Sequence, residues 1–172
     1  FISDIECAFE GGNPSARFDM LAIRWLASDR KDGGKCRAAL MEMKYGDNAL
    51  DGGAGILKHL QDINAVVSNP DKYGFLLKTM ESQFNQLDKL GLLNYNRCSN
   101  GTKVKLDARE KPEVVFLLAN HNPRSTVLLR TLNDSEVREY DENEHFDLRF
   151  FVSSFAGYGL HSDCMLTLTQ FE

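Results

Sequence analysis

The stretch Arg37-Ala-Ala-Leu-Met-Glu-Met-Lys-Tyr45 decides the fold, because it indicates a buried β-strand that carries an acid and a base near its end. Side chains two residues apart on a strand project from the same face, so Glu42 and Lys44 lie on one face. Burying an isolated carboxylate or ammonium is costly unless the group is paired or bound to a metal. The motif therefore indicates either a functional site or one salt bridge at the end of a strand.

A second apolar strand is indicated by Arg17-Phe-Asp-Met-Leu-Ala-Ile-Arg-Trp-Leu26, which holds a single aspartate, Asp19, near its start. Between the two strands lies the polar segment 28–35, whose Gly33-Gly34 pair is typical of a hairpin connection. Folding back there places Asp19 beside Glu42 or within a residue or two of it. Two carboxylates that close together are stable chiefly when a cation lies between them. We therefore expect a divalent ion to be shared by the two carboxylates.

In these residues the chain resembles the PD-(D/E)XK nuclease-like superfamily, which has the restriction-endonuclease-like fold. The family signature is a hydrophobic residue and an aspartate on one core strand, Glu-x-Lys on the next strand, and a helix that packs back on the sheet. Phe18-Asp19 and Glu42-Met43-Lys44 match it, with Phe18 in place of the proline that names the motif. Some branches place a glutamine of the following helix near the scissile strand, and Gln61 corresponds to it.

The resemblance implies a divalent-metal-dependent nuclease, a hydrolase of phosphodiester bonds in nucleic acid, with DNA as the expected substrate. Asp19 and Glu42, with the backbone carbonyl of Met43, would hold Mg²⁺ or Mn²⁺. Lys44 would lie near the attacking water or the developing charge, and Gln61 would point into the same cleft. The implied catalytic residues are therefore Asp19, Glu42, Lys44 and Gln61.

A second hypothesis is a catalytically inactive nuclease-fold protein that acts as an interaction or regulatory module. The net charge of −5 disfavours a protein that binds nucleic acid through a broadly basic surface. Much of the acidity lies in residues 134–147, which we interpret as a solvated loop, with a partner-binding segment as the alternative. The family usually starts with a helix, whereas residues 1–9 indicate a strand, so we expect a fragment that lacks this helix.

The order of elements predicts a single α/β (α+β) domain over residues 1–172, with a central mixed β-sheet flanked by helices. Its first three strands should form an antiparallel meander. Helices over 56–67 and from Pro70 to about Gly91 should then form the crossover to a strand over 114–119, parallel to its neighbour. A short helix over 125–132 and a C-terminal β-hairpin complete the prediction, with hairpin strands at 148–156 and 165–171.

The remaining patterns favour a cytoplasmic protein with no membrane segment, since no apolar run approaches the ~18 residues of a membrane span. The four cysteines are far apart, and no Cys-x-x-Cys pair indicates a zinc site. The four histidines, His59 among them, are also widely separated, and we interpret each as a surface or core residue rather than a ligand. A basic stretch over 94–112 is interpreted as a loop, with a phosphate-contacting arm as the alternative.

Overall fold

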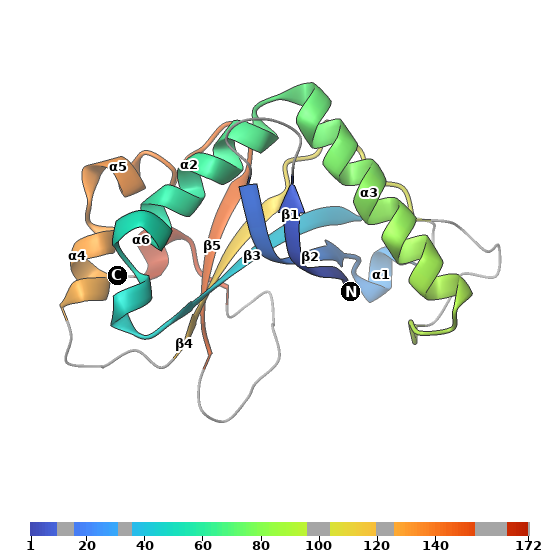
Figure 1. Ribbon diagram of the computed structural model, residues 1–172, viewed down its shortest axis with the longest axis horizontal. Helices are drawn as coiled ribbons and strands as arrows, with labels where there is room; N and C mark the ends of the chain where they lie inside the picture. Colours follow the sequence, from blue (N-terminus) through green and yellow to red (C-terminus); the bar gives the residue numbers. More distant parts are fainter. Residues whose placement is uncertain (10–15, 31–35, 96–103, 120–125, 154–164, 172) are drawn as a thin grey trace.

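The computed structural model describes residues 1–9, 16–30, 36–95, 104–119, 126–153 and 165–171 of the chain. Its centre is one five-stranded sheet with the strand order β1-β2-β3-β4-β5 (Figure 1). The strands are β1 (Ile2–Phe9), β2 (Ala16–Arg24), β3 (Arg37–Tyr45), β4 (Glu113–Ala119) and β5 (Asp147–Ser153). β1, β2 and β3 are antiparallel in turn, and β4 and β5 continue the sheet parallel to β3. The predicted meander and the parallel fourth strand are confirmed.

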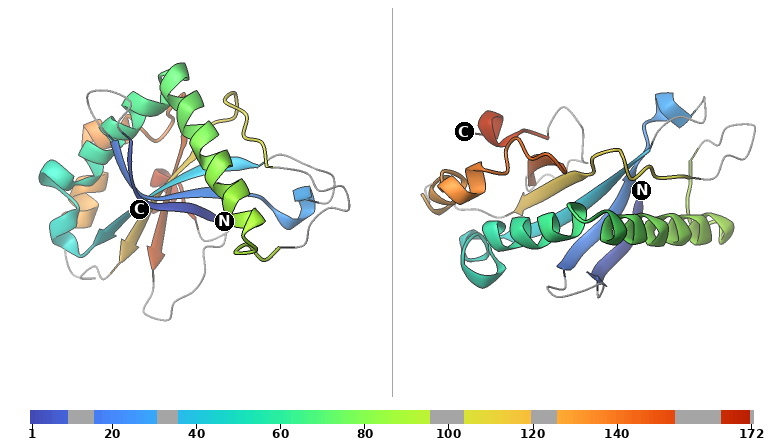
Figure 2. Two further views of the ribbon diagram at one scale, coloured as in Figure 1. Left: turned by 45° about the vertical axis from the view of Figure 1, so that its right-hand side comes forward. Right: turned by 90° about the horizontal axis from the view of Figure 1, so that it is seen from above.

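Two long helices, α2 (Ile56–Val67) and α3 (Pro70–Lys89), connect β3 to β4 and lie together across one face of the sheet (Figure 2). The apolar side of α2 packs into the main core, together with the sheet residues Leu21, Leu40 and Phe116. α3 begins where predicted, because the side chain of Asn69 accepts hydrogen bonds from the main-chain N–H groups of Asp71 and Lys72. A smaller apolar cluster around Val115 lies on the other face.

The β3 strand has the predicted bounds and a clear alternation at its carboxyl end. Leu40, Glu42 and Lys44 are buried, whereas Met43 and Tyr45 are exposed. The two charged residues therefore project into the side of the sheet that α2 and α3 cover. This alternation is the feature of the fold that positions the site.

The described residues also contain short helical segments. They are α1 (Ala27–Arg30), η1 (Asp47–Ala49), η2 (Gly52–Ala54), α4 (Val127–Leu132), α5 (Ser135–Arg138) and α6 (Leu168–Phe171). The helix predicted over 125–132 corresponds to α4. Among the described helices, none combines the length and the apolarity that crossing a bilayer requires.

The predicted C-terminal β-hairpin is wrong in its second strand. Residues Leu168–Phe171 form the helix α6, and in the described residues the expected pairing is limited to a bridge between Phe150 and Leu166. Residues 154–156 of the predicted first strand lie outside the described residues. The reason is a capping box: the Thr167 hydroxyl accepts from the N–H of Gln170, and the Gln170 side chain accepts from the N–H of Thr167. These two hydrogen bonds start a helical turn in a segment whose apolar alternation favoured a strand.

The acidic segment 134–147 is also more ordered than a solvated loop. It contains α5, and the carboxylate of Asp134 caps this helix by accepting a hydrogen bond from the N–H of Glu136. Val137 and Phe146 are each only 1% exposed and belong to the main core. The acids therefore occupy the outer side of a segment that the two apolar residues hold on the protein.

Candidate functional site

Asp19 lies where β2 and β3 begin to separate. The register of these strands begins with the pair Met20 and Met41, and Asp19 is the residue just before Met20 on β2. Its Oδ2 atom accepts a hydrogen bond of 2.7 Å from the main-chain N–H of Met43. The aspartate is thereby held on the segment that carries Glu42 and Lys44, as the hairpin predicted.

Glu42 is the most unusual residue of the site, because its carboxylate is buried with very little compensation. It is 1% exposed, and neither oxygen has a hydrogen-bond partner among the described residues. Oε2 does lie 2.9 Å from Nδ1 of His59, which is a close polar contact between the two side chains. Burial raises the pKa of Glu42 against the opposing effects of His59 and Lys44, and the charge of Asp19 raises it further.

Lys44 is 4% exposed and lies on the same face of β3. Its Nζ atom donates a hydrogen bond of 2.8 Å to the main-chain carbonyl oxygen of Ala54, in η2. Burial lowers the pKa of Lys44, while the carboxylates of Glu42 and Asp19 act in the opposite direction. Glu42 and Lys44, both in the described part of the chain, form no ion pair with each other. The motif is therefore not a single salt bridge at the end of a strand.

A pocket of about 460 Å³ opens beside these residues. Its lining residues come from β1, β2, η2 and α2: Glu6, Arg17, Phe18, Asp19, Gly53, Ala54, Lys58, His59 and Asp62. Glu42 and Lys44 lie directly behind this wall, since Glu42 contacts His59 and Lys44 bonds to Ala54. Of the three charged residues of the motif, Asp19 therefore lines the pocket, whereas Glu42 and Lys44 lie behind its wall.

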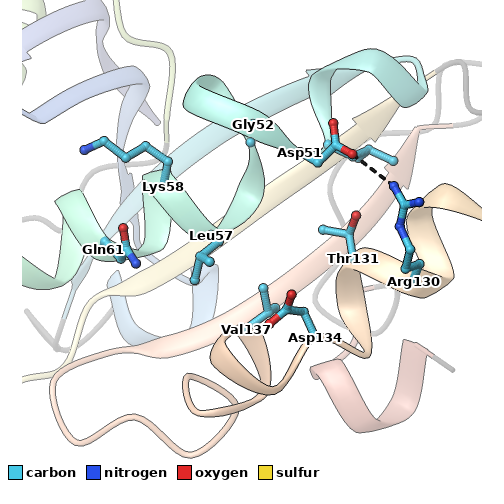
Figure 3. Close-up of a pocket in the computed structure, with 11 residues that line it drawn as sticks. Asp51, Gly52, Leu57, Lys58, Gln61, Arg130, Thr131, Asp134 and Val137 are labelled. Carbon is cyan, nitrogen blue, oxygen red and sulfur yellow. Dashed lines mark hydrogen bonds and ion pairs between the residues drawn. The ribbon is translucent and has the colours of Figure 1, made fainter.

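Gln61 does not lie in this pocket, and the prediction that it points into the cleft of Glu42 is wrong. It is exposed and lines a second pocket of about 520 Å³ between α2 and the segment of α4 and α5 (Figure 3). The physical reason is the rotation of about 100° per residue in an α-helix. His59 and Asp62 face the first pocket, whereas Gln61 lies farther round α2.

The site contains one residue that the sequence analysis set aside, His59. Its spacing in the sequence indicates this position. His59 follows Ile56 by three residues and precedes Ile63 by four, so it lies on the buried face of α2. A titratable side chain on an apolar stripe has to meet a polar partner in the protein. Glu42 is that partner.

The donor groups can be compared with the needs of a divalent cation. No three His, Cys, Asp or Glu side chains in the described ranges are grouped so as to hold a metal ion. The expected ligand set has only two carboxylates, from Asp19 and Glu42, and a main-chain carbonyl, which Mg²⁺ accepts together with water. The buried oxygens of Glu42, which have no hydrogen-bond partner among the described residues, fit a cation, because a bound cation would supply one.

Comparisons with protein-family models, with curated proteins and with solved structures give no match to this chain.

Proposed function

We propose that the protein is a divalent-metal-dependent nuclease that hydrolyses phosphodiester bonds of nucleic acid, with DNA as the expected substrate. The observation that carries the proposal is the buried carboxylate of Glu42, whose polar compensation is a contact with His59, with Asp19 and Lys44 close enough to affect its pKa. Such a carboxylate is a cost to the folded state. It is the kind of group that a protein keeps for binding or chemistry.

The proposed roles follow from the position of each group. Asp19, Glu42 and the main-chain carbonyl of Met43 would hold Mg²⁺ or Mn²⁺. When bound, the ion would lower the pKa of a water ligand and offset charge on the phosphate. Lys44 would place positive charge beside the reacting phosphate from behind the pocket wall, where low exposure strengthens its effect. This proposal gives Gln61 no catalytic role.

A second candidate function is an interaction or regulatory module that carries out no reaction. The observation that favours it is the depth of Glu42 and Lys44, which lie behind His59 and Ala54 rather than on the pocket surface. A nuclease requires these contacts to change when metal and substrate bind. An interaction module requires no such change.

Metal binding together with cleavage separates the two functions. The midpoint of thermal unfolding should rise when Mn²⁺ is added to the wild-type protein, because a ligand that binds only the folded state stabilises it. Glu42→Gln should abolish this rise and the cleavage of plasmid DNA. Glu139→Gln, at an exposed glutamate outside both pockets, is the matched control and should behave like wild type. If the wild type shows neither a shift nor cleavage, the interaction module is the better proposal.

A further inference from the structure

The second pocket is joined to the first by a shared side chain. Lys58 of α2 lines both the pocket of about 460 Å³ that contains Asp19 and the pocket of about 520 Å³ that contains Gln61. A polymer with one phosphate at the first pocket therefore has its neighbouring nucleotide within reach of the second. This inference rests on the proposed function, since the polymer is the nucleic acid proposed above.

The charges of the second pocket do not favour a phosphate group. Arg130 forms an ion pair of 3.1 Å with Asp51, which Figure 3 shows at the edge of the pocket. Lys58 is paired with Asp62. Both basic side chains are therefore already matched by acids, and Asp134 adds a further negative charge to the lining. Because like charges repel, the part of the ligand that enters should carry no negative charge.

The walls of the pocket suit a flat, uncharged group with polar edges. Leu57 from α2 provides half-buried apolar surface, and Val137 from α5 lies beside it with 1% exposure (Figure 3). Thr131 is 9% exposed, lines the pocket, and makes no side-chain hydrogen bond among the described residues. Gln61 and Asp134 add an amide and a carboxylate to the same lining. A volume of about 520 Å³ lies within the range of small-ligand sites.

We propose that this pocket receives the base of an unpaired nucleotide next to the scissile phosphate. A base offers an apolar face to Leu57, and its edge offers hydrogen bonds to Thr131 and Gln61. Enzymes and binding proteins recognise extruded or single-stranded bases by this combination of apolar contact and edge hydrogen bonding. A base inside a duplex cannot enter a side pocket, so the substrate is single-stranded or locally unpaired at this position.

The test measures the contribution of one base to binding. Single-stranded DNA oligonucleotides, each with one abasic site at a different position, are titrated with protein in Ca²⁺ and followed by fluorescence anisotropy. At one position, loss of the base should weaken binding to the wild-type protein about tenfold, the effect of 1.4 kcal/mol. The same oligonucleotides are incubated with Mn²⁺ to measure cleavage.

Two variants connect this effect to the pocket. Thr131→Val keeps the shape of the side chain and removes the hydroxyl, and Gln61→Ala removes an exposed amide, so the double variant should fold. It should bind intact and abasic oligonucleotides about equally. Gln86→Ala, at an exposed glutamine of α3 outside both pockets, should keep the tenfold difference. Thermal unfolding confirms that each variant is folded.

The possible outcomes separate this inference from the proposed function. Sensitivity to one base that the double variant loses supports the base pocket, even where no oligonucleotide is cleaved and the nuclease proposal fails. Cleavage with no sensitivity to any single base overturns the base pocket and leaves the nuclease proposal in place. Sensitivity that survives in the double variant, or no binding of oligonucleotides at all, also overturns the base pocket.

Discussion

The Nδ1 atom of His59 lies 2.9 Å from Oε2 of Glu42, which connects helix α2 to the strand that carries the charged motif. This contact is the polar compensation that the described residues give to the buried carboxylate. Glu42 therefore lowers the stability of the folded protein by its own burial. Removing the charge of Glu42 should therefore raise the stability of the protein, whereas removing the charge of a core glutamate in an ion pair lowers it.

Replacing Glu42 with glutamine should stabilise the protein while it abolishes metal binding. The amide has nearly the same shape but no charge to desolvate, so the free energy of unfolding at pH 8 should rise by on the order of 1–3 kcal/mol. Urea denaturation of wild type and Glu42→Gln measures the difference. A loss of stability would identify Glu42 as a structural partner of His59 instead.

The gain in stability from Glu42→Gln should depend on pH in a defined direction. The pKa of Glu42 is raised from its ordinary value of 4.5, so the folded state binds this proton more strongly than the unfolded state. The resulting stability is present below pH 4.5 and is lost as the pH rises through the raised pKa. The free energies of unfolding of wild type and variant should therefore differ least at acidic pH, and the difference should grow as the pH rises. Glu139→Gln should show no such trend.

His59→Ala should weaken the binding of Mn²⁺ by about 10- to 100-fold, the usual effect of removing a group that orients a metal ligand. The physical reason is that His59 is the side chain in contact with the carboxylate of Glu42. Calorimetric titration with Mn²⁺ measures the affinity, and His59→Gln, which restores a polar group, should recover part of it. Tighter binding in His59→Ala would show that the imidazole competes with the metal.

Much of the site's framework was predictable because it depends on local pattern. The β3 strand has the predicted bounds, and its period-two alternation placed Glu42 and Lys44 on one face. The polar connection between β2 and β3 was enough to predict the antiparallel pairing that brings Asp19 to Met43. These features follow from strand geometry and chain connectivity alone.

The errors concern features that depend on rotation and capping. The position of Gln61 on the helix after the Glu-x-Lys strand predicts that it points into the cleft of Glu42. The rotation of α2 places His59 in that pocket and Gln61 in the second one. At the C-terminus, the capping box of Thr167 and Gln170 overrode an alternation that favoured a strand. A contact such as that of His59 with Glu42 depends on how a helix is rotated on a sheet, which sequence spacing only restricts.

Asn69→Ala should destabilise the protein by about 1 kcal/mol, the usual cost of removing a side chain that caps a helix. The side-chain Oδ1 of Asn69 accepts two hydrogen bonds, from the main-chain N–H groups of Asp71 and Lys72, at 3.1 Å each. Urea denaturation measures the loss. Ser82→Ala, at an exposed position inside α3, should change stability much less. Equal effects of the two substitutions would contradict the importance of the cap for α3.

Lys44→Met separates binding from chemistry, because it keeps most of the apolar stem and removes the charge. A protonated amine cannot ligate a metal, so the affinity for Mn²⁺ should stay the same or increase as repulsion is removed. Turnover should fall by roughly 10²- to 10³-fold, the scale found for single groups that stabilise a transition state electrostatically. Calorimetric titration and a plasmid-cleavage assay measure the two effects, and Lys78→Met, at an exposed lysine of α3, is the matched control. Cleavage by Lys44→Met at the wild-type rate would reduce Lys44 to a structural group whose ammonium serves only to bond Ala54.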